Sequence, residues 1–110
     1  MPRGPIALLI LPRPVEELDQ AAEVAELLRA PGVVALEPGV LPALSGRRAR
    51  GQARRLLRRL PGRPVVIVVF GEGEHPLAEE LVRRLAGCEL IAARDTTGLR
   101  ARFAARGVEL

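Results

Sequence analysis

The run Val65–Phe70 constrains the fold of this chain more than any other segment. It places six β-branched or aromatic residues in a row without alternation, which is typical of a strand buried on both faces of a parallel sheet. A glycine-rich turn follows at Gly71–His75, and Pro76 suits the first position of a helix. Open α/β sheets bind ligands beyond the carboxyl end of such a strand. The segment therefore predicts an α/β scaffold and the first place to look for a site.

Other apolar segments predict further strands. These are Ile6–Leu11, Val33–Leu36 and Cys88–Ala93, and Val108–Leu110 has the composition of the opening of a fifth strand. Helical spacing separates them. The expected helices begin at Pro14, Arg47, Pro76 and Leu99, and glycine or proline ends each one. The first is expected to bury an apolar stripe made by Leu18, Ala21, Ala22, Ala25 and Leu28. The sequence thus predicts a three-layer, Rossmann-like βαβαβαβα fold with a mainly parallel sheet.

Length and composition limit the classes of function. A chain of 110 residues has the size of one domain, and we expect residues 1–110 to form a single unit. Its apolar runs are too short to span a bilayer, and Pro12 cuts short the apolar start that a signal peptide needs. Cys88 is the single cysteine, which excludes an internal disulfide and a cysteine metal cluster. We therefore expect a cytoplasmic protein with no metal or other cofactor.

Candidate site residues gather where the predicted strands end. They are Arg13, Gly71, Glu72, Gly73, Glu74, His75 and Arg94. The two glycines would give access to the backbone, His75 a polar contact, and Arg13 or Arg94 a clamp for an anion. The loop lacks the third glycine of a dinucleotide fingerprint, and the chain has no lysine for a P-loop. A tight turn with solvated acids explains the loop equally, and we assign no catalytic residue.

Arginine supplies the second anomaly. All 17 basic residues are arginine, and the net charge is +4. A group of them follows the expected second helix: Arg47, Arg48, Arg50, Arg54, Arg55, Arg58, Arg59 and Arg63. A surface for nucleic acid, acidic lipid or an acidic protein is one interpretation, carried chiefly by Arg47, Arg50, Arg54, Arg55, Arg58 and Arg59. The simpler interpretation, which we favour from the sequence, is a solvated helix face in a protein with an arginine-biased composition.

A resemblance to a known family rests on the order of the elements. The segments that carry it are Val33–Pro38, Arg54–Pro64, Val66–Phe70 with Pro76-Leu77-Ala78, and Cys88–Ile91. In this pattern the chain resembles the N-terminal Rossmann-like domain of a GT-B glycosyltransferase from a GC-rich actinobacterium. The resemblance implies a domain that shapes the acceptor side. No position matches the donor-binding residues of the second domain, so the chain alone is not expected to transfer a sugar.

Three functional hypotheses follow. The leading one is a small Rossmann-like module that binds a ligand or partner and becomes a glycosyltransferase only if a second domain completes it. The second is a nucleic-acid or acidic-partner binder that uses the arginine-rich helix 47–63. The third is a structural association module in which the edge at Val108–Leu110 pairs with another chain, as in a homo-oligomer.

Overall fold

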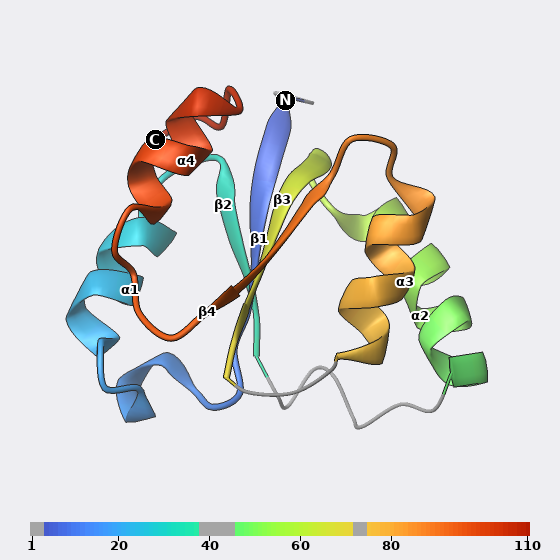
Figure 1. The fold of residues 1–110 in the computed structure, drawn as a ribbon, viewed down its shortest axis with the longest axis horizontal. Helices are drawn as coiled ribbons and strands as arrows, with labels where there is room; N and C mark the ends of the chain where they lie inside the picture. Colours follow the sequence, from blue (N-terminus) through green and yellow to red (C-terminus); the bar gives the residue numbers. More distant parts are fainter. Residues whose placement is uncertain (1–3, 38–45, 72–74) are drawn as a thin grey trace.

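The computed structural model describes residues 4–37, 46–71 and 75–110, and these residues form an α/β fold (Figure 1). Four parallel strands make one sheet in the order β2-β1-β3-β4. Their bounds are β1 Pro5–Ile10, β2 Val33–Leu36, β3 Arg63–Phe70 and β4 Glu89–Ala93. The predicted α/β class and parallel sheet are confirmed.

Helices cover both faces of the sheet. A 3-10 turn, η1, spans Val15–Glu17, and the helices are α1 Ala21–Leu28, α2 Gly46–Arg59, α3 Pro76–Arg84 and α4 Leu99–Ala105. Figure 1 shows α1 and α4 on one side of the sheet and α2 and α3 on the other. Right-handed crossovers require this division when the chain moves first to one edge and then to the other. Among the described residues, no helix is long and apolar enough to cross a membrane.

The strands bury alternate side chains in two separate cores. Ala7 and Leu9 of β1 pack in the layer with α1 and α4, while Leu8 and Ile10 pack against α2 and α3. Strand β3 behaves in the same way, which explains its unbroken apolar run. In α2, the buried face contains Ala49, Ala53 and Leu56, as the spacing predicts.

The predicted first helix is wrong at its start. The chain forms η1 after Pro14 and then turns at residues 18–20 before α1 begins at Ala21. The buried face of α1 is consequently Val24 and Leu27, whereas Ala22 and Ala25 are exposed. A helix that began at Pro14 would turn the small alanines toward the core. In the structure, the larger Val24 and Leu27 occupy that position.

The fifth strand expected at Val108–Leu110 is also absent from the described sheet. Gly107 adopts a positive φ of 80°, which turns the chain after α4 and brings Val108 into the core beside Phe103. A backbone hydrogen bond connects this segment to the residue before β2: the Gly32 N–H donates to the Glu109 carbonyl at 2.9 Å. The edges of the described sheet are β2 and β4, and Val108–Leu110 is not a strand of it.

Candidate functional site

The strand order places a change of chain direction between β1 and β3. The connection after β1 leads to β2 at one edge, and the next connection returns past β1 to β3 on its other side. The segments that leave the carboxyl ends of β1 and β3 therefore diverge toward opposite faces of the sheet. In open α/β sheets, this divergence opens the crevice in which ligands bind.

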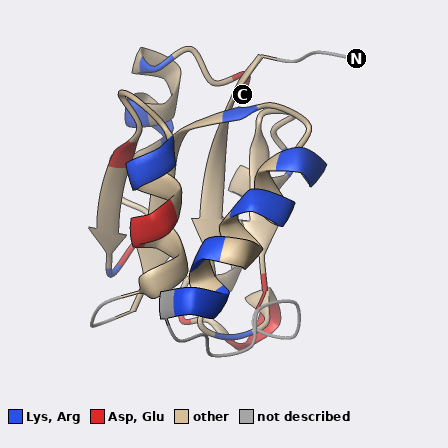
Figure 2. Ribbon diagram, turned by 90° about the vertical axis from the view of Figure 1, so that its right-hand side faces the viewer, with Lys and Arg blue, Asp and Glu red and all other residues tan. Residues whose placement is uncertain are grey.

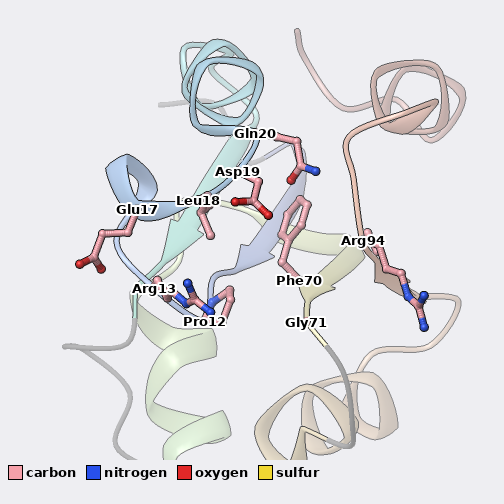
Figure 3. Close-up of a pocket in the computed structure, with 10 residues that line it drawn as sticks. Pro12, Arg13, Glu17, Leu18, Asp19, Gln20, Phe70, Gly71 and Arg94 are labelled. Atoms are coloured by element: carbon pink, nitrogen blue, oxygen red, sulfur yellow. The ribbon is translucent and has the colours of Figure 1, made fainter.

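A pocket of about 210 Å³ lies at this crevice (Figure 3). The ends of β1, β3 and β4 contribute to it, together with the turn between η1 and α1. Its polar lining consists of Arg13, Glu17, Asp19, Gln20 and Arg94, and the Phe70 side chain supplies an apolar surface. The structure thus brings together three of the residues predicted for the site: Arg13, Gly71 and Arg94.

The polar side chains of the pocket do not all point inward. In Figure 3, Asp19 and Gln20 point toward the Phe70 ring, and the Arg13 guanidinium lies beside Pro12. The side chains of Glu17 and Arg94 extend away from this group. The inward set is therefore one guanidinium, one carboxylate and one amide, which together offer donors and acceptors of both kinds. Such a set suits hydroxyl groups or a ligand that carries both charges better than it suits a phosphate alone.

Of the glycine loop, the structure describes Gly71 and His75. Gly71 has a positive φ of 119° and lies exposed at the pocket. Its N–H donates to the Ala93 carbonyl at 3.4 Å, so this amide already has an acceptor. The candidates Glu72, Gly73 and Glu74 lie outside the described residues.

His75 serves as the N-cap of α3. Its backbone is extended, and the Ala78 N–H donates to its Nδ1 at 3.3 Å. Pro76 occupies the first helical position, where a missing N–H has no cost. Burial lowers the pKa of His75, while a backbone hydrogen bond and the nearby Glu79 carboxylate act more weakly in the opposite direction. The ring does not line the pocket, and its observed contact is structural.

Cys88 and the acidic residues give no further centre. Burial raises the pKa of the half-buried Cys88 thiol, which favours the protonated form over a nucleophilic thiolate. Among the residues that the structure describes, no three His, Cys, Asp or Glu side chains gather closely enough to hold a metal ion. The crevice pocket is therefore the candidate small-molecule site, because it lies at the carboxyl ends of the strands.

The arginines of α2 form a second surface. Seven of the helix's 14 residues are arginine, and all seven side chains are exposed: Arg47, Arg48, Arg50, Arg54, Arg55, Arg58 and Arg59. We call this set the arginine face. Figure 2 shows its blue bands along the length of α2. Arg63 is not part of the arginine face. It lies at the start of β3, and its guanidinium donates to the Ala86 carbonyl at 3.0 Å.

The sequence interpretation missed Asp19 and Gln20. It placed both inside one continuous helix from Pro14, on which they would be solvated side chains. The break after η1 instead turns them toward the strand ends. The signal in the sequence was the polar pair itself, because Asp favours turns and helix N-termini over helix interiors.

The geometry is the basis for interpreting this site. Comparisons with protein-family models, with curated proteins and with solved structures returned no match to this chain.

Proposed function

We propose that this chain is a Rossmann-like ligand-binding module whose crevice pocket holds a small polar molecule. The observation that carries the proposal is that Asp19 and Gln20 point toward the Phe70 ring while Arg13 lines the same pocket beside Pro12, at the carboxyl ends of the strands. A carboxylate accepts hydrogen bonds from hydroxyl groups, and a side-chain amide can both accept and donate them. A guanidinium holds a carboxylate through two parallel hydrogen bonds. Hydroxy acids and sugars are therefore the ligand classes that we favour.

We further propose that a second domain or a partner chain completes the site. A pocket of about 210 Å³ is smaller than the roughly 300–1,000 Å³ of typical ligand sites. The surface of a second domain, facing this pocket across the crevice, would enclose the ligand. The resemblance to the N-terminal domain of a GT-B glycosyltransferase implies such an arrangement. In that arrangement the chain would contribute the acceptor side and would not catalyse alone.

A wider hollow at the opposite edge of the sheet fits this role less well. It measures about 660 Å³ and lies where α2 ends and β3 begins. Its lining is mainly apolar and includes two arginines: Leu57, Arg58, Leu60, Pro61, Gly62, Arg63, Pro64 and Leu85. It lies at the amino ends of the strands, where open α/β sheets do not form their ligand crevice.

The test is a titration of the chain, labelled with 15N, with glucose, citrate and inorganic phosphate as separate probes. Binding in the crevice should shift the amide signals of Arg13, Gln20 and Gly71. Asp19→Asn and Arg13→Gln should each weaken binding about tenfold or more, because a hydrogen bond to a charged group contributes about 1.5–3 kcal/mol. Arg29→Gln, an exposed change outside the pocket, is the matched control.

The result also separates the ligand classes. Shifts with glucose alone would favour a sugar acceptor, and shifts with citrate alone would favour a carboxylate held by Arg13. If all three probes leave the crevice amides unmoved up to the solubility limit, the module does not bind these ligands alone. A titration that moves only amides of α2 would refute the crevice as the binding site.

A further inference from the structure

We propose that the arginine face of α2 binds the phosphate backbone of a nucleic-acid duplex. This surface is separate from the crevice: Figure 1 places α2 in the layer on the far side of the sheet from α1 and α4. The inference is therefore independent of the function proposed for the pocket, and either can fail without the other.

Concentration of charge is the first argument. The arginine face holds seven of the chain's 17 arginines within a helix of 14 residues that has no acidic residue. The rest of the chain contains ten arginines and all 13 acidic residues. A compositional bias toward arginine would spread the residues over many elements. The chain instead carries a strongly positive helix on a remainder that is slightly negative, which is the charge pattern of a polyanion-binding surface.

Part of the arginine face works against the stability of its own helix, although Arg58 and Arg59 lie in the last turn, where the dipole favours positive charge. Arg47, Arg48 and Arg50 lie at the start of α2, where the helix dipole disfavours positive charge. Arg54 repeats the charge four residues after Arg50 and four before Arg58, which adds like-charge repulsion. Among the described residues, no ion pair involves the arginine face. On the neighbouring helix α3, Glu80 pairs with Arg83 and Arg84. An external anion would relieve this repulsion.

Helical geometry divides the arginine face into two rows. At about 100° per residue, Arg47, Arg50, Arg54 and Arg58 form one row, and Arg48, Arg55 and Arg59 form the other. Gly51 falls between the rows. A Cβ at this position would meet only the Arg55 guanidinium, at 3.8 Å, so packing within the protein does not require glycine here. Because only the flexible Arg55 guanidinium lies over Gly51, another backbone can approach α2 closely here once that side chain turns toward an anion.

This arrangement favours a duplex over the other polyanions. The major groove of B-form DNA, about 12 Å wide, admits an α-helix with one phosphate strand on each side. The major groove of an RNA duplex is too narrow, so DNA is the duplex favoured. Single strands are bound through exposed aromatic platforms, but Phe70 and Phe103 are buried and the chain has no Trp or Tyr. A membrane helix inserts its apolar face, whereas Ala49, Ala53 and Leu56 of α2 are buried in the protein core.

The decisive experiment measures binding of the full chain to a fluorescent 20-base-pair DNA and to an RNA duplex from 50 to 200 mM salt. We expect affinity to fall steeply with salt. Arg50→Gln/Arg54→Gln/Arg58→Gln should weaken binding at least tenfold and make the salt slope shallower by about 0.9 for each phosphate that is no longer neutralised. The matched control is Arg29→Gln/Arg100→Gln/Arg102→Gln, which removes the same charge from the α1 and α4 side of the sheet.

A second variant tests whether the duplex approaches α2 closely at Gly51, without changing the charge of the protein. Gly51→Leu fills the gap between the rows and should weaken duplex binding severalfold while the salt slope stays the same. Thermal melts of all variants check the fold, and the neutralised α2 variant should be at least as stable as the wild type at low salt because repulsion is removed.

Three outcomes would overturn the proposal. One is equal loss of affinity in the matched control, which would mean that net charge alone attracts the duplex. Another is unchanged affinity in the neutralised α2 variant or in Gly51→Leu. The last is tighter binding to vesicles with acidic lipid, or to an acidic polypeptide such as polyglutamate, than to either duplex at 150 mM salt.

Discussion

At the scale of single residues, His75 links the stability of α3 to pH. The Ala78 N–H donates to His75 Nδ1, which requires that this nitrogen be unprotonated. Burial lowers the folded pKa below the ordinary histidine value of 6.5, so the unfolded chain binds the proton more readily. The cap therefore contributes fully above pH 6.5, and its contribution is lost as pH falls through the lower folded pKa.

This predicts a specific difference between wild type and His75→Asn. Asn is a good N-cap that does not titrate, so the variant should keep its free energy of unfolding as pH falls from 7 to 5. The wild type should become less stable over the same interval, because protonation of Nδ1 removes the cap. Urea denaturation at intervals of half a pH unit measures both. Parallel pH profiles would mean that the His75 cap does not contribute to stability.

Gly62 is a residue whose lack of a side chain is sterically required. A Cβ at this position would clash with the carbonyl oxygen of Gly4 and would lie 2.8 Å from Ile6 Cγ2. Gly62→Ala should therefore destabilise the protein by about 1–3 kcal/mol, the usual effect of overpacking. Gly4→Ala is the control, because its added methyl group meets nothing within 4 Å. Similar denaturation midpoints for the two variants would contradict this explanation.

At the scale of elements, the sequence predicted what depends on local pattern. Val65–Phe70 makes up the last six residues of β3, because six apolar residues in a row need cover on both faces, which a parallel α/β sheet gives. The buried face of α2 was predicted for a similar reason, since Ala49, Ala53 and Leu56 repeat at helical spacing. Patterns of this kind are set by residues within one element.

What the sequence did not reveal depends on contacts between elements. The order β2-β1-β3-β4 arises from tertiary packing, so the loops that flank the crevice could not be identified beforehand. The sequence did not predict the turn at residues 18–20, because Leu18, Ala21 and Leu28 have the spacing of one apolar helix face. In the structure, the buried face of α1 is formed by Val24 and Leu27. Asp19 and Gln20 reach the pocket only through that turn, so the sequence identified Arg13 and Arg94 of the pocket lining and missed Asp19 and Gln20.

Gly51 lowers the stability of helix α2 relative to most other residues at the same position. Among the described glycines, positive φ angles occur at Gly71, Gly87, Gly98 and Gly107, so Gly51 is in a conformation that alanine adopts easily. Gly51→Ala should therefore stabilise the protein by about 0.5–1 kcal/mol, because alanine loses less backbone entropy in a helix. Thermal or urea denaturation measures the gain. A loss of stability would show that α2 tolerates no added methyl group and would remove the steric argument for the gap between the arginine rows.

At the scale of the whole molecule, two surfaces of different chemistry share one framework. The crevice pocket depends on the carboxyl ends of three strands, while the arginine face depends only on the exposed side of α2. The sheet separates α2 from the layer of α1 and α4, and each layer has its own core. Changes on the surface of α2 should therefore leave the crevice intact, which is why the two proposed activities can be tested in the same protein.

Phe103 is the side chain on which the α1 and α4 layer most depends. It is the largest of the fully buried side chains, and it packs in the core with Val24, Leu99 and Val108. Phe103→Ala should lower the free energy of unfolding by about 3–5 kcal/mol, through reduced burial and the cavity that remains. Domains of this size have about 5–15 kcal/mol in total, so the variant should fold with little stability to spare.

The comparison for Phe103→Ala is Leu90→Ala, a truncation on β4 at a side chain that is 42% exposed. It should change stability by no more than about 0.5 kcal/mol. Urea denaturation followed by circular dichroism gives both values, and an unchanged slope against denaturant would show that both variants unfold in the same cooperative transition. If Phe103→Ala lost only as much as Leu90→Ala, the packing of α4 on the sheet would not contribute to stability as its burial indicates.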